Sequence, residues 1–203
     1  MFQDYLQFLE YLRYSPRDVI HFSAGTYHRL FGLYNAEVFP APLAGLALVV
    51  AAIALAIAGR PRVVAAILAL CWLWIAWMFH WRHLATIHLG GGFIALCWTL
   101  QAALLLWRGP RLRFAGLNWP GLILCIAALT APPLAILLSG RPWAEIELAG
   151  TAPDATAIAT LGLVLMARGR AAWWLLVLPL AWCAVSGATL QAMRLETAAM
   201  LPY

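Results

Sequence analysis

The sequence contains no lysine, few charged residues of either sign and no pattern of paired cysteines. All 13 basic residues are arginine, and charged residues make up 10% of the 203 positions, against about a quarter in soluble domains. Because the arginines are spread along the chain, the net charge of +5 does not form the basic face that binds nucleic acid, and we exclude a nucleic-acid partner. The four cysteines lie in apolar segments and indicate no disulfide framework. They are Cys71, Cys97, Cys125 and Cys183.

The motifs of common enzyme classes are also missing. There is no serine nucleophile elbow, no pair of catalytic carboxylates and no metalloprotease motif. The run Gly90-Gly91-Gly92 lacks the lysine and the polar context of a phosphate-binding loop. Residues 1–14 have neither a basic region nor a continuous apolar core, so we do not expect a cleavable signal peptide. We therefore do not expect enzyme activity from this chain on its own.

Apolar residues dominate what is present. They make up 65% of the chain, and the mean hydropathy is +0.84, which predicts a membrane protein in contact with the lipid bilayer. A spanning helix needs roughly 20 apolar residues, and six stretches reach or approach that length. We therefore predict an all-α polytopic transmembrane helix bundle of about six spans, of which the short fifth is the least certain to cross the bilayer. The predicted spans are 43–58, 63–79, 84–107, 119–139, 155–167 and 171–193.

Residues 1–40 precede the first predicted span and have helical periodicity. Apolar side chains recur at helical spacing over residues 2–12, which indicates an amphipathic helix. A serine followed by proline then provides an N-cap and a first-turn proline for a second helix over residues 16–33. We predict two parts, an external helical N-terminal arm (1–40) and a six-span bundle (41–203).

Arginines alternate between the joints that connect the predicted spans. The joints after the first, third and fifth spans hold two, three and two arginines, and the remaining joints and the tail hold one each. By the positive-inside rule the richer joints face the cytoplasm, so both termini face the periplasm if the membrane is a bacterial inner membrane. All five histidines then lie on the outer side of the membrane.

The stretch from Cys71 to Gly92 concentrates ionisable and aromatic side chains. His80 and His83 share a helix face, and His88 follows after a short turn. Imidazole is a common ligand of transition metals and haem iron, so these three histidines are candidate ligands of a metal or of a b-type haem, and Asp154 is a further candidate metal ligand. The competing interpretation is that the histidines lie at the membrane interface and bind nothing.

Trp74, Trp77 and Trp81 follow one another at helical spacing within the same stretch. Such a stripe is typical of packing rather than of a cofactor site. Together with Arg82, these tryptophans form the surface that we predict to contact a partner protein.

Three segments resemble the DUF6064 family, a family of uncharacterised bacterial multi-pass membrane proteins. They are YNAEVFPAP, LALCWLWIAWMFHW and PDATAIATLGLVLM. The resemblance covers most of the chain from Tyr34 onward and implies a compact inner-membrane bundle with no established activity. Where the family pattern leads us to expect a cysteine after proline, this chain has Asp154, and Ala155 and Ala157 stand in place of a proline and a threonine. The resemblance therefore implies no thiol chemistry here.

Two functions remain open from the sequence. One is an accessory or anchoring subunit that docks a membrane or periplasmic partner, with a metal or haem for electron transfer or metal handling. The other is a transporter or channel for a small solute or metal ion, in which the proline-containing fourth and sixth spans move. The absence of an acidic or basic residue at mid-depth in any predicted span argues against an ion-coupled pump.

Overall fold

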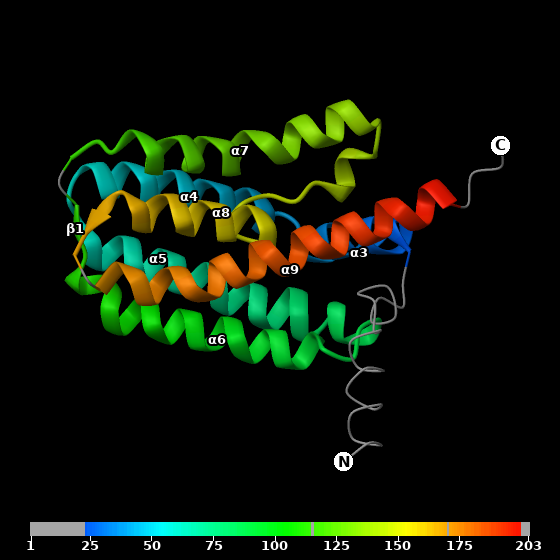
Figure 1. The fold of residues 1–203 in the computed structure, drawn as a ribbon, viewed down its shortest axis with the longest axis horizontal. Coiled ribbons are helices and arrows are strands. Elements are labelled where there is room, and N and C mark those ends of the chain that lie inside the picture. The colour runs from blue at the N-terminus through cyan, green and yellow to red at the C-terminus, as the bar shows by residue number, and fades with distance from the viewer. Residues whose placement is uncertain (1–22, 115, 170, 200–203) are drawn as a thin grey trace, which may run out of the picture.

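The computed structural model describes residues 23–114, 116–169 and 171–199 (Figure 1). This part of the chain forms seven α-helices and a two-stranded ribbon, which confirms the all-α fold class. The predicted amphipathic helix over residues 2–12 lies outside the described residues. The helices are α3 (Ala24–Val38), α4 (Ala41–Ile57), α5 (Pro61–Trp74), α6 (Gly91–Arg108), α7 (Trp119–Ser139), α8 (Pro153–Leu165) and α9 (Ala171–Ala199).

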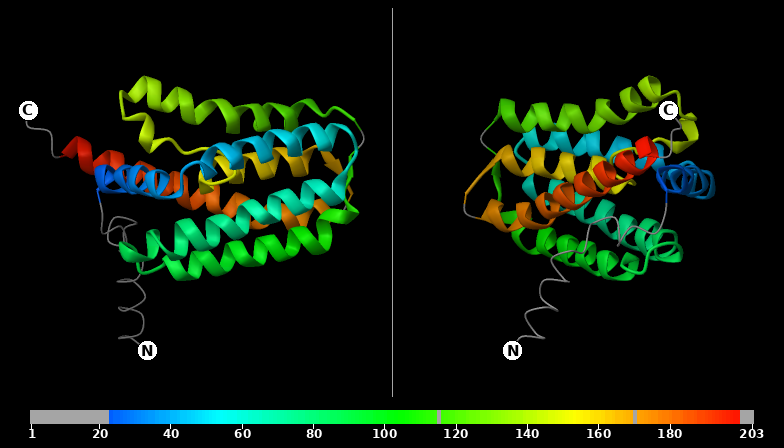
Figure 2. Two further views of the ribbon diagram at one scale, coloured as in Figure 1. Left: turned by 180° about the vertical axis from the view of Figure 1, so that it is seen from behind. Right: turned by 45° about the vertical axis from the view of Figure 1, so that its right-hand side comes forward.

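Helices α4 to α9 run alongside one another in alternating directions (Figures 1 and 2). Helix α8 lies at the centre and packs against α7 and α9. Ten of its 13 residues are buried, so this short apolar helix is enclosed by protein. Helix α3 is bent by 92° from α4, at Pro40, where proline disfavours helical backbone in the residue before it.

Four helical segments are long and apolar enough to cross a membrane. A fifth is added if the bent pair α3 and α4 counts as one span, while α8 is shorter. The full count of six spans stays a prediction. The four segments are Pro61–Thr86, Gly91–Arg111, Trp119–Ser139 and Ala172–Met193.

One predicted helix start is wrong, and one predicted helix is interrupted. The third span begins at Gly91 rather than at Leu84, because residues 84–86 form a 3-10 turn, η2 (Leu84–Thr86), and a further turn precedes the helix. The helix predicted over residues 16–33 does not run through Ser23, whose side chain caps α3 by accepting a 3.2 Å hydrogen bond from the Thr26 N–H. Residues 16–22 of that prediction lie outside the described residues.

The last turns of the span that starts with α5 are π-helical. This segment, η1 (Ile75–Trp81), continues α5 without a break and carries His80 and two of the predicted interface tryptophans. Single π-helical turns within α-helices are frequent at functional positions. The segment is therefore a candidate functional position.

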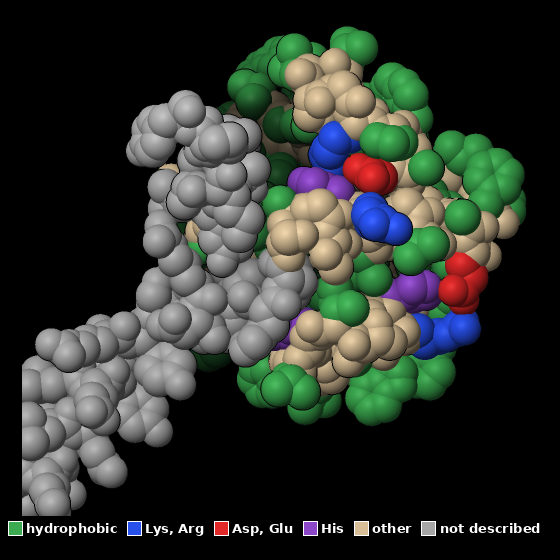
Figure 3. Space-filling view, turned by 90° about the vertical axis from the view of Figure 1, so that its right-hand side faces the viewer, with side chains coloured by type: hydrophobic (Ala, Val, Ile, Leu, Met, Phe, Trp, Pro, Cys, Tyr) green, Lys and Arg blue, Asp and Glu red, His purple; other side chains and the backbone are tan. Residues whose placement is uncertain are grey.

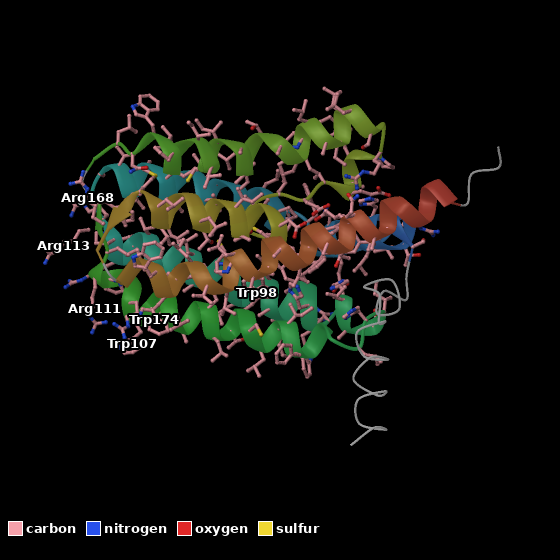
Figure 4. All side chains as sticks on the ribbon, in the orientation of Figure 1. Trp98, Trp107, Arg111, Arg113, Arg168 and Trp174 are labelled. Atoms are coloured by element: carbon pink, nitrogen blue, oxygen red, sulfur yellow. The ribbon has the colours of Figure 1, made fainter. Side chains whose placement is uncertain are left out.

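Charged residues separate between the two ends of the bundle. We call one the arginine end; it holds the turn from α4 to α5, the 3-10 turn η3 (Gly109–Arg111) and the ribbon of β1 (Arg113–Phe114) with β2 (Ala167–Arg168). Figure 4 shows Arg111, Arg113 and Arg168 at this end.

We call the opposite end of the bundle the histidine end. It holds α3, η1, η2 and the α7–α8 connection, and Figure 3 shows its histidine, acidic and arginine side chains. The described histidines His28, His80, His83 and His88 belong to it.

The α7–α8 connection folds back into the bundle. It includes the turn η4 (Trp143–Glu145), and residues 148–153 are all buried. Gly150 has φ +98 and lies against the backbone of Gly45 in α4, where a side chain would collide. The Tyr34 hydroxyl donates a 3.1 Å hydrogen bond to the Thr151 carbonyl. These contacts fix the N-terminus of α8 inside the protein.

Candidate functional site

Asp154 lies in the first turn of α8, inside the bundle. Its Oδ1 accepts a 2.6 Å hydrogen bond from Trp182 Nε1, and its Oδ2 accepts a 2.7 Å bond from Ser186 Oγ. Both donors belong to α9, where they are the eleventh and fifteenth of the 22 residues in the apolar segment Ala172–Met193. The carboxylate therefore lies near the middle of a helix long enough to cross a membrane. The predicted span bounds place Asp154 one residue before the fifth span. In the structure it lies beside the middle of α9 instead of at the end of the bundle, because short α8 starts within the bundle.

Two adjoining hollows connect Asp154 with the histidine end, and we call them together the acidic cavity. The first, about 260 Å³, lies between α7 and α9 and is lined by Arg141, Glu147, Asp154 and apolar residues of α7 and α8. The second, about 540 Å³, shares Arg141 and Glu147 with the first and extends to His28. A polar strip thus follows one side of a cavity whose other walls are apolar.

Arg141 and Glu147 set the electrostatics of the acidic cavity. The Arg141 guanidinium donates to His28 Nδ1 and lies 3.9 Å from the Glu145 carboxylate. The pKa of Glu147 is raised to about 8, chiefly by burial; the nearby charge of Asp154 contributes to the rise, and Arg141 acts in the opposite direction. Glu147 therefore gains and loses its proton close to neutral pH.

A third, smaller hollow of about 80 Å³ borders the two α9 residues that hold Asp154. Its lining includes Trp182 and Ser186 from α9, Tyr27 from α3 and His88. The His88 Nδ1 accepts a 3.0 Å hydrogen bond from the Gly90 N–H. His88 thus faces the same part of α9 as Asp154, from a separate hollow.

His80 lies in the core and not at the outer surface. Its ring is fully buried, with Nδ1 3.2 Å from the Ile75 carbonyl oxygen, and it packs edge-on against Trp182 with ring centroids 5.3 Å apart. Within the described residues its Nε2 has no hydrogen-bond partner. His80 therefore adjoins the tryptophan that binds Asp154.

His83 is held by oxygen atoms on both sides of its ring. Its Nδ1 lies 2.6 Å from the Met78 carbonyl oxygen and its Nε2 lies 3.0 Å from Glu37 Oε2. Because both nitrogens are engaged, neither is available to a metal without breaking one of these contacts. Arg82 binds the same carboxylate, 3.0 Å from Glu37 Oε1.

The predicted metal or haem ligands do not form one cluster. His80 is in the core, His83 is bound to Glu37 and His88 lines a separate hollow, while Asp154 is bound to α9. In the described ranges no three His, Cys, Asp or Glu side chains are arranged to hold a metal ion. The geometry therefore gives the metal or haem hypothesis no support.

The predicted interface tryptophans separate into two kinds. Trp77 and Trp81 are exposed, stack with ring centroids 6.4 Å apart and line an apolar groove of about 440 Å³ between η1 and α6. Trp74 is half-buried and donates a 2.7 Å hydrogen bond to the Tyr34 hydroxyl. Only the first two form an outward surface.

The fold and its long apolar helices indicate the class of protein, an all-α helix bundle of the membrane-spanning type. Within that class the chain belongs to the DUF6064 family, a family of unknown function, whose model matches residues 24–202. No curated protein and no solved structure matched the chain. The family match confirms the resemblance seen in the sequence, and the activity has to be inferred from the site.

Five members of the site are not among the site residues predicted from the sequence, and one of them is Glu147. His28 and Arg141 are 113 residues apart in the chain, so only the fold brings them together. Trp182 and Ser186 are spaced i, i+4 on an apolar helix, which places an indole N–H and a hydroxyl on one face. This spacing on α9, together with Asp154 in the first turn of the short helix α8, is the feature of the sequence that could have indicated the site.

Proposed function

We propose that the chain is a transporter or channel for a small cationic solute, with the acidic cavity as its binding site and Asp154 as the central carboxylate. The observation that carries the proposal is the contact of Asp154 with Trp182 and Ser186, halfway along a long apolar helix. Ionisable groups at such depth are costly and are usually kept for ion or solute pathways.

The short helix α8 supports the proposal. It is preceded by a buried, irregular connection rather than by another turn of helix. Irregular backbone at membrane depth is tolerated where protein buries it or where it borders a cavity, and many transporters build their sites at the ends of such half-length helices. The acidic cavity is next to the start of α8.

The side chains around the cavity favour a small cation. Glu147 and Asp154 line it beside a single arginine, which is already engaged with His28 and Glu145. The hollow beside Asp154 has a volume of about 260 Å³ and mostly apolar walls. A proton or a small protonated amine fits this size and charge, whereas an anion would meet two carboxyl groups.

Flux through proteoliposomes tests the proposal. We expect the purified protein to carry methylammonium, or protons measured with an entrapped pH dye, down an imposed gradient. Asp154→Asn should lower the initial rate at least about tenfold, because the variant loses the carboxylate near mid-depth. Glu37→Gln, which removes an exposed acid at the same end, is the matched control and should keep the rate. Flux equal to that of protein-free vesicles, or unchanged in Asp154→Asn, would contradict the proposal.

An accessory subunit is the second candidate, favoured by the exposed pair Trp77 and Trp81. Purification of the intact complex from native membranes, followed by mass spectrometry, tests it. A defined partner that is lost in Trp77→Ala/Trp81→Ala but kept in Trp173→Ala, another exposed tryptophan, would support this function. A stable protein without any stoichiometric partner would exclude it.

The orientation in the membrane is part of the proposal. We infer a bacterial inner membrane, with the arginine end in the cytoplasm and both termini in the periplasm, from the distribution of arginines. The acidic cavity then opens toward the periplasm.

A further inference from the structure

A second charged site lies at the arginine end. It uses the membrane orientation inferred above but does not depend on transport through the acidic cavity. The strands β1 and β2 pair antiparallel, in a register that sets Arg113 directly opposite Arg168. Like charges opposite one another across a ribbon repel and destabilise the pairing. Both side chains are exposed. The fold therefore sets two arginines at directly opposite positions of the ribbon, at a cost in free energy.

The two arginines have no partner in the described part of the protein. No ion pair or hydrogen bond of either guanidinium is present there. The acidic side chains that the structure describes belong to the histidine end or to the interior, at the opposite side of the molecule from the ribbon. They are Glu37, Glu145, Glu147 and Asp154.

Arg108 and Arg111, the neighbours of Arg113 in the chain, are engaged with the protein itself, in contrast to the ribbon pair. Arg60 and Arg62, in the turn from α4 to α5, also have no ion pair or side-chain hydrogen bond among the described residues. Arg111 donates a hydrogen bond to the Trp107 carbonyl at the end of α6. The Arg108 guanidinium lies over the Trp107 ring, 4.0 Å from its centroid. Arg111 thus bonds a helix-end carbonyl and Arg108 packs on an aromatic ring. Arg113 and Arg168 make no such contact and are free to bind an external anion.

Exposed tryptophans at this end are typical of a membrane interface. Trp107 and Trp174 are 57% and 62% exposed, and Figure 4 shows both at the same end of the bundle as the labelled arginines. Tryptophan is enriched at the level of lipid headgroups. A ligand of the ribbon therefore has to be an anion that is present at that level.

We propose that Arg113 and Arg168 together bind the phosphate of an anionic phospholipid headgroup. A guanidinium presents a planar fork of N–H donors that matches phosphate oxygens, and two adjacent forks can hold one phosphate from both sides. The bound phosphate offsets the repulsion across the ribbon. Negatively charged headgroups are concentrated in the cytoplasmic leaflet, where polybasic segments attract them.

Native mass spectrometry of the full-length protein in detergent tests this site. The probes are dioleoylphosphatidylglycerol, dioleoylphosphatidylcholine and inorganic phosphate. We expect retained phosphatidylglycerol, weak retention of phosphatidylcholine, and an affinity for phosphatidylglycerol about tenfold lower in Arg113→Gln/Arg168→Gln. Arg60→Gln/Arg62→Gln removes the same charge from the same end outside the ribbon, and should lower the affinity at most about threefold. Circular dichroism checks that both variants keep their helices.

Three results would overturn the proposal. Equal losses in the two double variants would mean that the general positive charge of this end attracts lipid. Inorganic phosphate that binds at the ribbon while phosphatidylglycerol does not would assign the site to a free anion. If Arg113→Gln/Arg168→Gln does not fold, Arg113→Lys/Arg168→Lys keeps the charge but loses the forks, and undiminished phosphatidylglycerol binding in that variant would exclude recognition by paired guanidinium groups.

Discussion

At the scale of single residues, Gln101 compensates for a proline in the neighbouring helix. Pro179 has no N–H and therefore leaves the carbonyl of Leu175, four residues earlier in α9, without its helical hydrogen bond. The buried Gln101 side chain on α6 donates a 3.0 Å hydrogen bond to that carbonyl. A polar residue in an apolar span is thus explained by packing, because it satisfies a buried backbone oxygen.

A double-mutant cycle tests this compensation. Gln101→Leu should lower the stability by about 1 kcal/mol, because the Leu175 carbonyl loses its donor. In a Pro179→Ala background the alanine N–H can bond Leu175, so the same substitution should cost about half as much or less. Thermal unfolding in detergent, followed by tryptophan fluorescence, measures both. Identical costs in the two backgrounds would show that Gln101 and Pro179 act independently.

Glu147 makes the stability depend on pH. Its pKa of about 8 in the folded protein is above the ordinary value of 4.5, so between these pH values the folded state binds more protons than the unfolded state. Stability contributed by the protonated carboxyl is therefore lost as the pH rises from about 4.5 through 8. Glu147→Gln should remove this loss and be more stable than the parent at pH 8.5, by at least about 1 kcal/mol.

The comparison at pH 5 is the control for Glu147→Gln. There the native carboxyl is protonated, and glutamine resembles it, so the two proteins should unfold at similar temperatures. A variant whose advantage is the same at pH 5 and pH 8.5 would show that the carboxyl does not titrate in this range.

At the scale of elements, the α7–α8 connection determines where the site lies. Its close packing on α4 depends on Gly150, whose positive φ and contact with Gly45 exclude a side chain. Gly140 also has a positive φ, +67, but has open space where a side chain would lie. Alanine at Gly140 therefore costs backbone strain alone, whereas alanine at Gly150 costs backbone strain and a steric collision with α4.

Substitution of the two glycines by alanine tests this packing. We expect Gly140→Ala to cost about 1 kcal/mol, since only the backbone conformation is strained, and Gly150→Ala to cost about 3 kcal/mol or more, since α8 must also move away from α4. The unfolding midpoints of the detergent-solubilised variants report the difference. Equal costs would mean that the connection does not pack closely against α4.

The positions of most helices follow from the sequence, and their ends follow less well. Apolar runs locate α7 at its observed bounds and α4 and α8 within two residues, because burial in lipid or protein requires continuous apolar surface. The start of α6 is missed, because a 3-10 turn can also be apolar, and hydropathy does not distinguish it from helix. The π-helical form of η1 is not distinguished from α-helix by the apolar pattern of its residues, although it buries Phe79 and His80 in the core.

The candidate site follows from the sequence only in part. Asp154 is marked by its position after a proline, but its partners Trp182 and Ser186 lie 28 and 32 residues away and are brought near by the fold. The three histidines His80, His83 and His88 do not form the predicted cluster, again because the fold and not the spacing in the chain decides which side chains meet. Spacing places His80 and His83 on neighbouring turns, yet the π-helical turn sends His80 into the core and His83 to Glu37.

At the scale of the whole molecule, the two ends have different chemistry. The arginine end combines exposed arginines with exposed tryptophans, and the histidine end combines the acids and histidines with the acidic cavity. Between them most of the bundle surface is apolar, as a protein in contact with lipid requires. The sequence predicts this polarity from the alternation of arginines, whereas the depth of the cavity depends on the short α8, which no count of charges reveals.

The central claim is that water and small solutes reach Asp154 from the histidine end. Labelling of a Ser186→Cys variant, with the four native cysteines replaced by alanine, tests it most directly. A membrane-impermeant thiol reagent should modify the introduced thiol from the periplasmic side of intact spheroplasts and not from the cytoplasmic side of inverted vesicles. Gly187→Cys, one residue further on an open face of α9, should stay unmodified because lipid covers it. Absence of labelling at position 186 from either side, or equal labelling at position 187, would contradict a solute pathway to Asp154.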